Sequence, residues 1–309
     1  MKLTITKELT AELKGIAILM VIIGHLSQIF GTSFLNYMGA FGVGIFLFIS
    51  GYGLTLSFES KGLDNFFKKR IVTVWMPYAI VTFVLIILSY FQGITFDAKT
   101  NLLLILGFDY NRSMDPTMWY ISFILLWYVL FYIVFKFIKD NRLKALFFVI
   151  CGVAFYKMQF PSILADLSWQ WEIHAFTFPL GVIVALYVKN GIKQQYLIVS
   201  CICTALAMIY FYRHISESTG YYMLTNIATA VTLITAIVAL SNNCGILKFA
   251  KIVGKYSYEL YLVEGYMISV VFSRVQETLI AIVLYVILIA ILSFLLHRFI
   301  GQFIDKILS

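Results

Sequence analysis

Charged residues are scarce in this sequence. Asp, Glu, Lys and Arg together make up 12% of the 309 residues, while 61% are hydrophobic. A soluble domain carries about 25% charged residues. This composition therefore excludes a soluble domain and indicates a helical protein that crosses a membrane several times. The 4 prolines leave little room for flexible linkers, so we expect one integral membrane domain over residues 1–309.

Cysteine is also scarce, and its arrangement does not suggest a metal site. The 4 cysteines lie in or beside apolar segments. They form no Cys-x-x-Cys pair and lie near no His at ligand spacing, which are the usual signs of a zinc site. We expect no bound metal and interpret these residues as small packing side chains: Cys151, Cys201, Cys203 and Cys244.

Long apolar runs recur along the whole chain. No Ala-x-Ala cleavage site follows the first run, which is long enough to span a membrane, so we expect it to be a retained helix. Hydropathy predicts about ten spans, at about residues 10–30, 36–58, 71–92, 117–138, 143–160, 173–188, 195–212, 221–241, 256–273 and 278–297. The predicted fold is an all-α polytopic membrane protein, with both termini on the same side because the number of spans is even.

The net charge of +8 is distributed unevenly over the predicted loops. With the N-terminus in the cytoplasm, 18 of the 23 Lys and Arg residues lie in cytoplasmic segments and helix ends. Membrane proteins carry this excess on their cytoplasmic side. The charge therefore predicts cytoplasmic termini and membrane lipids as surroundings, and it gives no reason to expect a nucleic-acid partner.

The first span holds two ionisable side chains, Lys14 and His25. Eleven residues are about three helical turns, so both lie on nearly the same face, about 16 Å apart along the axis. Ionisable groups in spanning helices usually face a bundle interior or a water-filled site, and His is suited to moving protons near neutral pH. The structural alternative is that Lys14 reaches the membrane surface and His25 only hydrogen-bonds a neighbouring helix.

The second span is rich in glycine. Close packing of helix backbones explains Gly42 and Gly44. Ser50 stands between an apolar run and Gly51, where it serves either as a polar contact or as a local break in the helix.

A basic cluster follows the second span and includes Lys69 and Arg70. Such cations fit an anionic ligand at the cytoplasmic face, because Arg and Lys pair with phosphate. A topology signal or contacts with lipid head groups explain the cluster equally well.

Five segments, in matching order over about residues 7–270, resemble the acyltransferase 3 family of integral membrane acyltransferases. They are the cation and histidine Lys14 and His25, the run Phe41–Gly53, the pair Arg70 and Pro77, the segment Trp119–Ser122, and the segment Val253–Glu264. The sequence departs from the family pattern at three positions. Lys14 stands where Arg is usual, Thr73 where a second Arg is frequent, and Glu264 where His is usual.

The resemblance implies transfer of an acyl group, commonly acetyl from acetyl-CoA, to a hydroxyl of a cell-envelope carbohydrate, and hence a bacterial plasma membrane. Acetyl-CoA or another acyl-CoA is then a donor substrate, and no permanently bound cofactor is expected. His25 becomes the general base or acyl acceptor. Glu264 orients His25 or relays its proton, or else forms a structural hydrogen bond between helices. Lys14, Lys69 and Arg70 become the ligands of the donor phosphates.

Acceptor binding is expected from side chains at span ends. Glu172 and His174 lie among Trp169 and Trp171, where they would bind a sugar by stacking and hydrogen bonds. Tryptophans at a membrane interface are otherwise ordinary anchors. Trp119 and Ser50 complete the expected acceptor contacts.

Two other function classes remain open at this point. A transporter or flippase for a sugar- or lipid-linked solute would use Lys14, His25 and Glu264 as a polar relay. An accessory subunit without activity would descend from an acyltransferase. The absence of an internal repeat disfavours the transporter, and the retention of His25 disfavours the accessory subunit.

Overall fold

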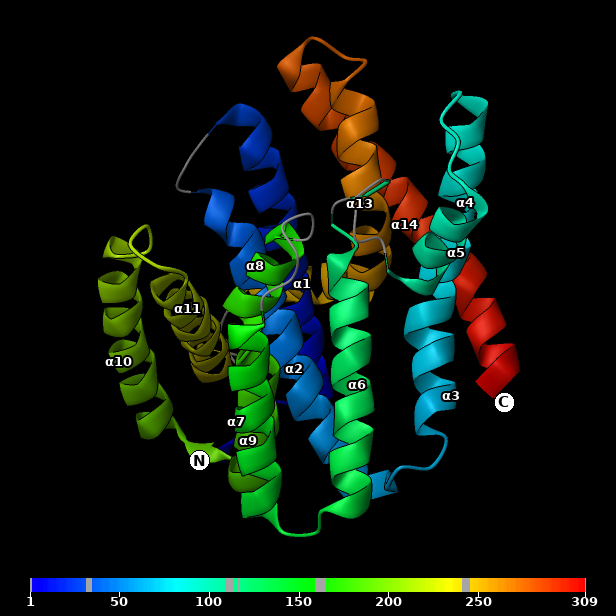
Figure 1. The fold of residues 1–309 in the computed structure, drawn as a ribbon. Helices are drawn as coiled ribbons and strands as arrows, with labels where there is room; N and C mark the ends of the chain where they lie inside the picture. The colour runs from blue at the N-terminus through cyan, green and yellow to red at the C-terminus, as the bar shows by residue number, and fades with distance from the viewer. Residues whose placement is uncertain are drawn as a thin grey trace. The chain divides into compact units, whose positions relative to one another are not determined.

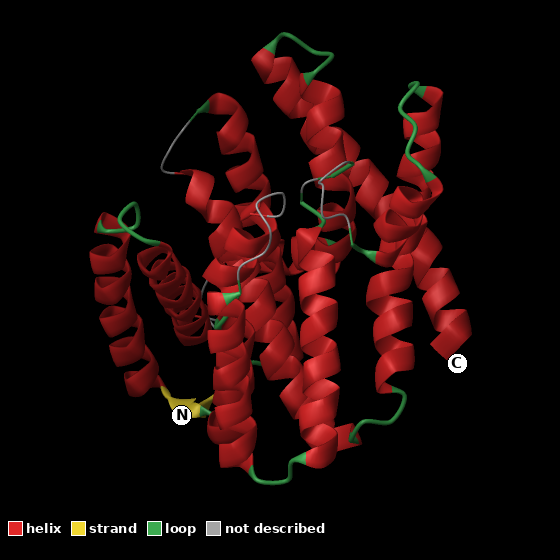
Figure 2. Cartoon of the chain, in the orientation of Figure 1, coloured by secondary structure: helices red, strands yellow, loops and turns green. Residues whose placement is uncertain are grey.

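The computed structural model describes residues 2–31, 35–108, 114–115, 117–158, 165–240 and 245–308. At residues 2–3, 165–167, 245–247, 305 and 308 only the backbone is described. About 85% of the described residues are helical. One two-stranded antiparallel sheet pairs β1 (Lys2–Leu3) with β2 (Ile192–Lys193), and Figure 2 shows it in yellow beside the N-terminus. The predicted all-α class is therefore confirmed apart from this short pairing.

The chain forms two compact units, each built from two separate stretches of sequence. Unit 1 contains Met1–Gly62 and Ile133–Ser257, and unit 2 contains Leu63–Tyr132 and Tyr258–Ser309. Unit 1 holds α1 (Lys7–Phe30), the 3-10 turn η1 (Leu35–Tyr37), α2 (Met38–Lys61), α7 (Asn141–Lys157), α8 (Ala165–His174), α9 (Thr177–Val188), α10 (Gln194–Arg213), α11 (Thr219–Leu240) and α12 (Gly245–Lys255). The single domain expected over residues 1–309 stays a prediction.

Unit 2 is the smaller of the two. It holds α3 (Phe66–Arg70), the π-helix η2 (Ile71–Trp75), α4 (Met76–Phe91), α5 (Ala98–Leu106), α13 (Ser257–Phe272) and α14 (Thr278–Leu308). The helix α6 (Trp119–Phe137) begins in unit 2 and ends in unit 1. Figure 1 colours these elements along the chain, α3 and α4 in blue to cyan and α13 and α14 in orange to red.

Helix α1 has well-defined ends. The hydroxyl of Thr6 accepts a hydrogen bond from the Leu9 N–H at 3.2 Å, which satisfies one of the free donors at the helix start. Gly31 ends the helix in the left-handed conformation, with a φ of 66° that glycine adopts without steric cost. The helix is continuous between these caps.

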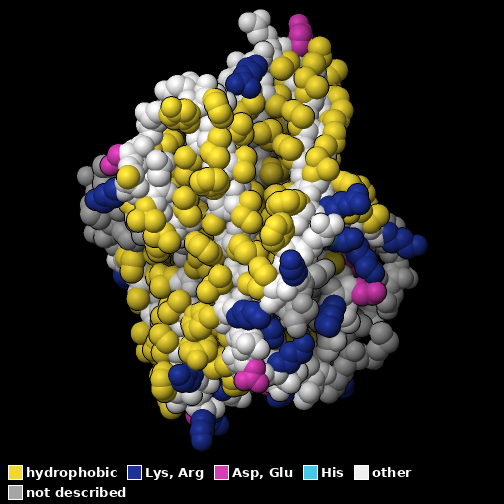
Figure 3. Space-filling model, turned by 90° about the vertical axis from the view of Figure 1, so that its right-hand side faces the viewer, with side chains coloured by type: hydrophobic (Ala, Val, Ile, Leu, Met, Phe, Trp, Pro, Cys, Tyr) yellow, Lys and Arg dark blue, Asp and Glu magenta, His cyan; other side chains and the backbone are white. Residues whose placement is uncertain are grey.

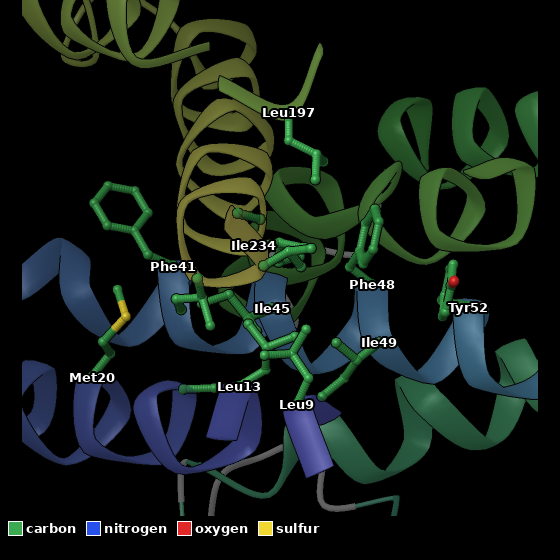
Figure 4. Close-up of a cluster of buried hydrophobic side chains, with 14 of the residues drawn as sticks. Leu9, Leu13, Met20, Phe41, Ile45, Phe48, Ile49, Tyr52, Leu197 and Ile234 are labelled. Atoms are coloured by element: carbon green, nitrogen blue, oxygen red, sulfur yellow. The ribbon is translucent and has the colours of Figure 1, made fainter. Parts of the chain in front are cut away.

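The core of unit 1 forms where α1, α2 and α11 meet. Leu9, Leu13 and Ala17 recur every four residues on α1, so they lie on one face and are buried together. Figure 4 shows the side chains of Leu9 and Leu13 directed toward those of α2 and α11. Their partners in the cluster include Phe41, Ile45, Phe48, Ile49, Tyr52, Leu197 and Ile234.

Glycine allows α2 to approach its neighbours closely. A Cβ atom at Gly42 would lie 2.4 Å from the Ala17 carbonyl oxygen of α1. A Cβ atom at Gly44 would lie 2.6 Å from the Asn226 Oδ1 atom of α11. Real Cβ contacts are never this short, so the packing interpretation of both glycines agrees with the structure.

Eight helical segments of the described residues are long and apolar enough to cross a membrane. They are Lys7–Phe30, Leu35–Lys61, Phe66–Phe91, Trp119–Phe137, Ser168–Val188, Gln194–Arg213, Thr219–Leu240 and Thr278–Ile304. The other two predicted spans are helical but short, with 17 residues in α7 and 16 in α13. These lengths correspond to about 26 Å and about 24 Å, against a hydrocarbon core of about 30 Å. The count of ten spans and the cytoplasmic termini stay predictions.

Exposed apolar side chains cover the surfaces of α4 and α14. Figure 3 shows a broad hydrophobic face, with Lys and Arg side chains gathered toward its lower part. The exposed residues of these helices include Phe83, Val84, Ile87, Leu88, Leu279, Ile280, Val283, Ile287, Ile291, Phe294, Leu295 and Phe299. An apolar surface of this extent is costly in water and is the normal surface of a helix in contact with lipid.

Candidate functional site

Lys14 and His25 lie on one uninterrupted helix, α1. The three-turn separation predicted from their spacing therefore applies, which is about 16 Å along the axis. Lys14 is exposed and His25 is half-buried. A half-buried imidazole in a membrane helix is both shielded from bulk solvent and accessible to a reactant, which are the conditions that a general base needs.

The turn of α1 that carries His25 is held against the start of α2. Gly24 lies so close to α2 that a Cβ atom there would be 2.4 Å from the Gly39 backbone nitrogen. One turn later, the Ser27 hydroxyl donates to the Gly24 carbonyl oxygen at 2.7 Å and lies 2.7 Å from Asn36 Oδ1. These contacts fix the backbone on both sides of His25.

His174 is fully buried, with 0% exposure, at the end of α8. Its Nδ1 atom lies 2.8 Å from the Gln170 carbonyl oxygen, and its Nε2 atom lies 3.1 Å from the Ala40 carbonyl oxygen of α2. The ring thus joins α8 to the first turn of α2. The same turn of α2 contacts α1 at Gly24, so both histidine-bearing helices meet at the start of α2.

The other acceptor candidates of α8 are more accessible than His174. Glu172 is half-buried, Trp169 is 39% exposed, and Trp171 is buried. Trp169 and Glu172 are three residues apart and therefore share one face of the helix. This face is partly exposed, whereas the His174 ring lies between two backbone carbonyl oxygens.

An aromatic cluster next to Trp169 was not predicted from the sequence. The Trp169 ring lies 5.2 Å from that of Tyr222, the Tyr222 ring 5.3 Å from that of Tyr37, and the Tyr37 ring 5.7 Å from that of Tyr212. These four residues come from α8, α11, η1 and α10. No local sequence pattern links them, because the cluster exists only after the four elements have packed.

Ser50 is half-buried within α2. The helix runs without interruption from Met38 to Lys61, so Ser50 does not break it. The next residue, Gly51, packs closely on α9, where a Cβ atom would lie 2.4 Å from the Phe178 carbonyl oxygen. Of the two interpretations of Ser50, the helix break is therefore excluded, and the interpretation as a polar contact is kept.

Arg70 of unit 2 is held between aromatic rings. Its guanidinium carbon lies 5.6 Å from the Phe66 ring centroid and 5.3 Å from that of Tyr128. The buried Nε atom has no hydrogen-bond partner among the described residues. Arg70 immediately precedes the π-helix η2, a feature that is frequent at functional sites. Lys69 beside it is half-buried.

Trp119 begins α6, where it is half-buried. Its ring lies 6.2 Å from that of Tyr120 and 6.1 Å from that of Phe123. The residue therefore forms the end of an aromatic row along α6, consistent with either packing or stacking on a ligand.

Glu264 is fully buried in α13, with 0% exposure. The Tyr285 hydroxyl of α14 donates to Glu264 Oε2 at 3.2 Å. A carboxyl group inside a membrane helix needs a partner, and the Tyr285 hydroxyl supplies one. Glu264 continues a row of polar side chains on one face of α13, in which Tyr258 donates to the Val74 carbonyl oxygen and Tyr261 to that of Thr117.

Asp115 is a second buried carboxylate of unit 2, with 3% exposure. Its Oδ1 atom accepts hydrogen bonds from the Thr117 N–H at 2.9 Å and the Thr117 hydroxyl at 2.7 Å. A Cβ atom at Gly265 would lie 2.6 Å from the same oxygen. An Asp two residues before a Thr, just ahead of an apolar span, is the local turn signal that could have revealed it.

The predicted site residues divide between the units. Unit 1 contains Lys14, His25, Ser50, Glu172 and His174, and unit 2 contains Lys69, Arg70, Trp119 and Glu264. Their roles in catalysis and binding stay predictions. The buried partners Asp115 and Tyr285, and the aromatic cluster, are additions from the structure.

Comparison with known proteins assigns the chain to a family. A family model described as an acyltransferase domain matches residues 13–298, almost the whole chain. Comparisons with curated proteins and with solved structures give no match. The matched region contains every predicted site residue from Lys14 to Glu264. Because the family model covers the sequence so completely, the chain belongs to the acyltransferase 3 family, whose members are membrane acyltransferases.

Proposed function

We propose that this protein transfers an acyl group, acetyl in the first instance, from a cytoplasmic acyl-CoA to a hydroxyl of a cell-envelope carbohydrate in a bacterial plasma membrane. The observation that carries the proposal is the match to the acyltransferase family over residues 13–298. The candidate residues supply the chemical groups that such a transfer needs.

His25 is the proposed general base. In the reaction its imidazole takes the proton of the acceptor hydroxyl while the hydroxyl oxygen forms a bond to the thioester carbonyl carbon. The carbon–sulfur bond of the tetrahedral intermediate then breaks, and the departing thiolate takes the proton from the imidazolium. An acyl-imidazole intermediate on His25 is the alternative route. The contacts of Gly24 with the start of α2 and of Ser27 with Asn36 of η1 support the role, because a base must be held in place.

Arg70 is the proposed ligand of a donor phosphate, together with Lys69 and Lys14. The aromatic rings of Phe66 and Tyr128 hold the Arg70 guanidinium without neutralising it. A guanidinium in this state retains its charge and donors for a phosphate. Glu264 completes the proposed catalytic set as the buried carboxylate of unit 2.

Glu172 is the proposed acceptor ligand on α8, with the exposed ring of Trp169 on the same helix face. A carboxylate accepts hydrogen bonds from sugar hydroxyls, and an aromatic face attracts the partial positive charge of the sugar C–H groups. Ser50 and Trp119 are further proposed contacts. The buried ring of His174 supports this site by fixing α8 to α2.

Mass spectrometry of envelope glycans tests the proposal. We expect glycans from cells that express the protein to carry an ester-linked acyl group that is lost when the gene is deleted. Expression of the parent protein should restore the group, and expression of an equally abundant His25→Gln variant should not. Identical glycans in the parent and deletion strains would overturn the proposal.

A further inference from the structure

The ring of Tyr285 is held rigidly in unit 2. The side chain is fully buried, with 0% exposure, and its ring lies 6.2 Å from that of Phe272 on α13. A buried aromatic ring has few accessible rotamers, so this packing fixes the direction of the phenol oxygen. That oxygen lies 3.2 Å from Glu264 Oε2.

The glutamate side chain has more rotatable torsions than the tyrosine side chain. A glutamate side chain has three rotatable torsions, and ordering it costs conformational entropy. Removal of the hydrogen bond from Tyr285 would return part of that freedom to the carboxylate. The rigid phenol thus favours one orientation of the Glu264 carboxyl group.

The two buried carboxylates near Gly265 each have a hydroxyl donor of their own. Tyr285 donates to Glu264, and Thr117 donates to Asp115 at 2.7 Å. Asp115 lies against Gly265, the residue that follows Glu264. The two hydroxyl groups thus hydrogen-bond two different carboxyl groups.

We propose that Tyr285 is a positioning residue for acyl transfer, whose hydroxyl holds the Glu264 carboxylate in the orientation that the reaction uses. The proposal rests on the membership of Glu264 in the catalytic set. Tyr285 itself touches neither substrate nor reacting atoms in this assignment. It acts on the rate of the transfer step and not on the binding of donor or acceptor.

A double-mutant cycle on the purified full-length protein tests the assignment. Tyr285→Phe removes only the hydroxyl, and we expect kcat for acyl transfer from acetyl-CoA to fall about 10- to 100-fold, the loss typical of a misplaced group. The KM values of donor and acceptor should stay within about two-fold. In the Glu264→Gln background the same substitution should change kcat by less than about two-fold, because two residues that act through one another are not additive.

Tyr78→Phe is the matched control. Tyr78 is also buried in unit 2, and its hydroxyl donates to the Leu104 carbonyl oxygen at 2.6 Å. Both variants should lower the thermal midpoint to a similar extent, but only Tyr285→Phe should lower kcat. A parental kcat in Tyr285→Phe, or equal losses in the parent and Glu264→Gln backgrounds, would overturn the positioning role. Full activity of Glu264→Gln would instead overturn the proposed role of Glu264 itself, and with it that of Tyr285.

Discussion

Asn226 of α11 lies against the bare backbone of Gly44 on α2, where a Cβ atom would be 2.6 Å from the amide Oδ1. The amide cannot move away easily, because its Nδ2 group donates to the Ile173 carbonyl oxygen at 3.0 Å and the side chain is fully buried. Asn226 therefore connects three helices: its own helix α11, α2 through Gly44, and α8 through Ile173.

Gly44→Ala should therefore destabilise unit 1. Adding a methyl group to a closely packed site typically costs about 1–3 kcal/mol, which thermal unfolding of the detergent-purified protein would reveal as a lower midpoint. Gly53→Ala on the same helix is the control, since nothing lies within 4 Å of its Cβ position and alanine is the better helix former. An unchanged midpoint for Gly44→Ala would mean that the Asn226 amide has an alternative position.

The sequence predicts local features of this fold better than long-range ones. The spacing of Lys14 and His25 follows from helix geometry alone, and the continuous α1 agrees with it. Hydropathy predicted the positions of α7 and α13. It did not predict where these helices begin and end, and both are shorter than the expected spans. Asp140, for example, caps α7 by accepting hydrogen bonds from the N–H groups of Arg142 and Leu143 at 2.8 and 2.9 Å.

Contacts between distant segments were beyond the reach of the sequence. Glu264 and Tyr285 belong to different helices, and nothing in either segment indicates the other as its partner. The position of His174 beside interfacial tryptophans indicated an accessible side chain. Its burial results from the packing of α8 on α2, which places the Ala40 carbonyl oxygen 3.1 Å from the ring. The longest outer loop that hydropathy predicts, at about residues 92–117, includes Asp109 and Arg112, which lie outside the described residues.

The charge distribution predicts opposite sides of the membrane for Lys68 and Lys99. Both are exposed, Lys68 on α3 and Lys99 on α5, with α4 between them in the chain. In a cysteine-free background, Lys99→Cys should react with an impermeant thiol reagent in intact cells. Lys68→Cys should react only after the membrane is permeabilised. Reaction of both positions in intact cells would exclude the predicted orientation.

Loss of the Arg70 charge should weaken the donor interaction. A hydrogen bond to a charged group contributes about 1–3 kcal/mol, so the apparent KM for acetyl-CoA should rise about 5- to 150-fold in Arg70→Gln. The same direction is expected for Lys14→Gln, and acceptor KM should change little in both. Lys99→Gln removes an exposed charge of unit 2 and serves as the control. An unchanged apparent KM for acetyl-CoA in both Arg70→Gln and Lys14→Gln would mean that these cations only set the membrane topology.

Substitution of His25 decides whether this histidine has a catalytic or a structural role. Gln has a similar reach and still forms hydrogen bonds, but it cannot take up a proton at neutral pH. His25→Gln should therefore reduce kcat by about 100-fold or more, the contribution typical of a positioned general base. The thermal midpoint should stay near that of the parent, because Gly24 still packs on the start of α2 and Ser27 still contacts Asn36 of η1. His214→Gln is the control, since His214 pairs with Glu217 at the surface of unit 1. If His25→Gln folds normally and transfers acyl groups at the parental rate, the imidazole only packs between helices, and the base must be sought elsewhere.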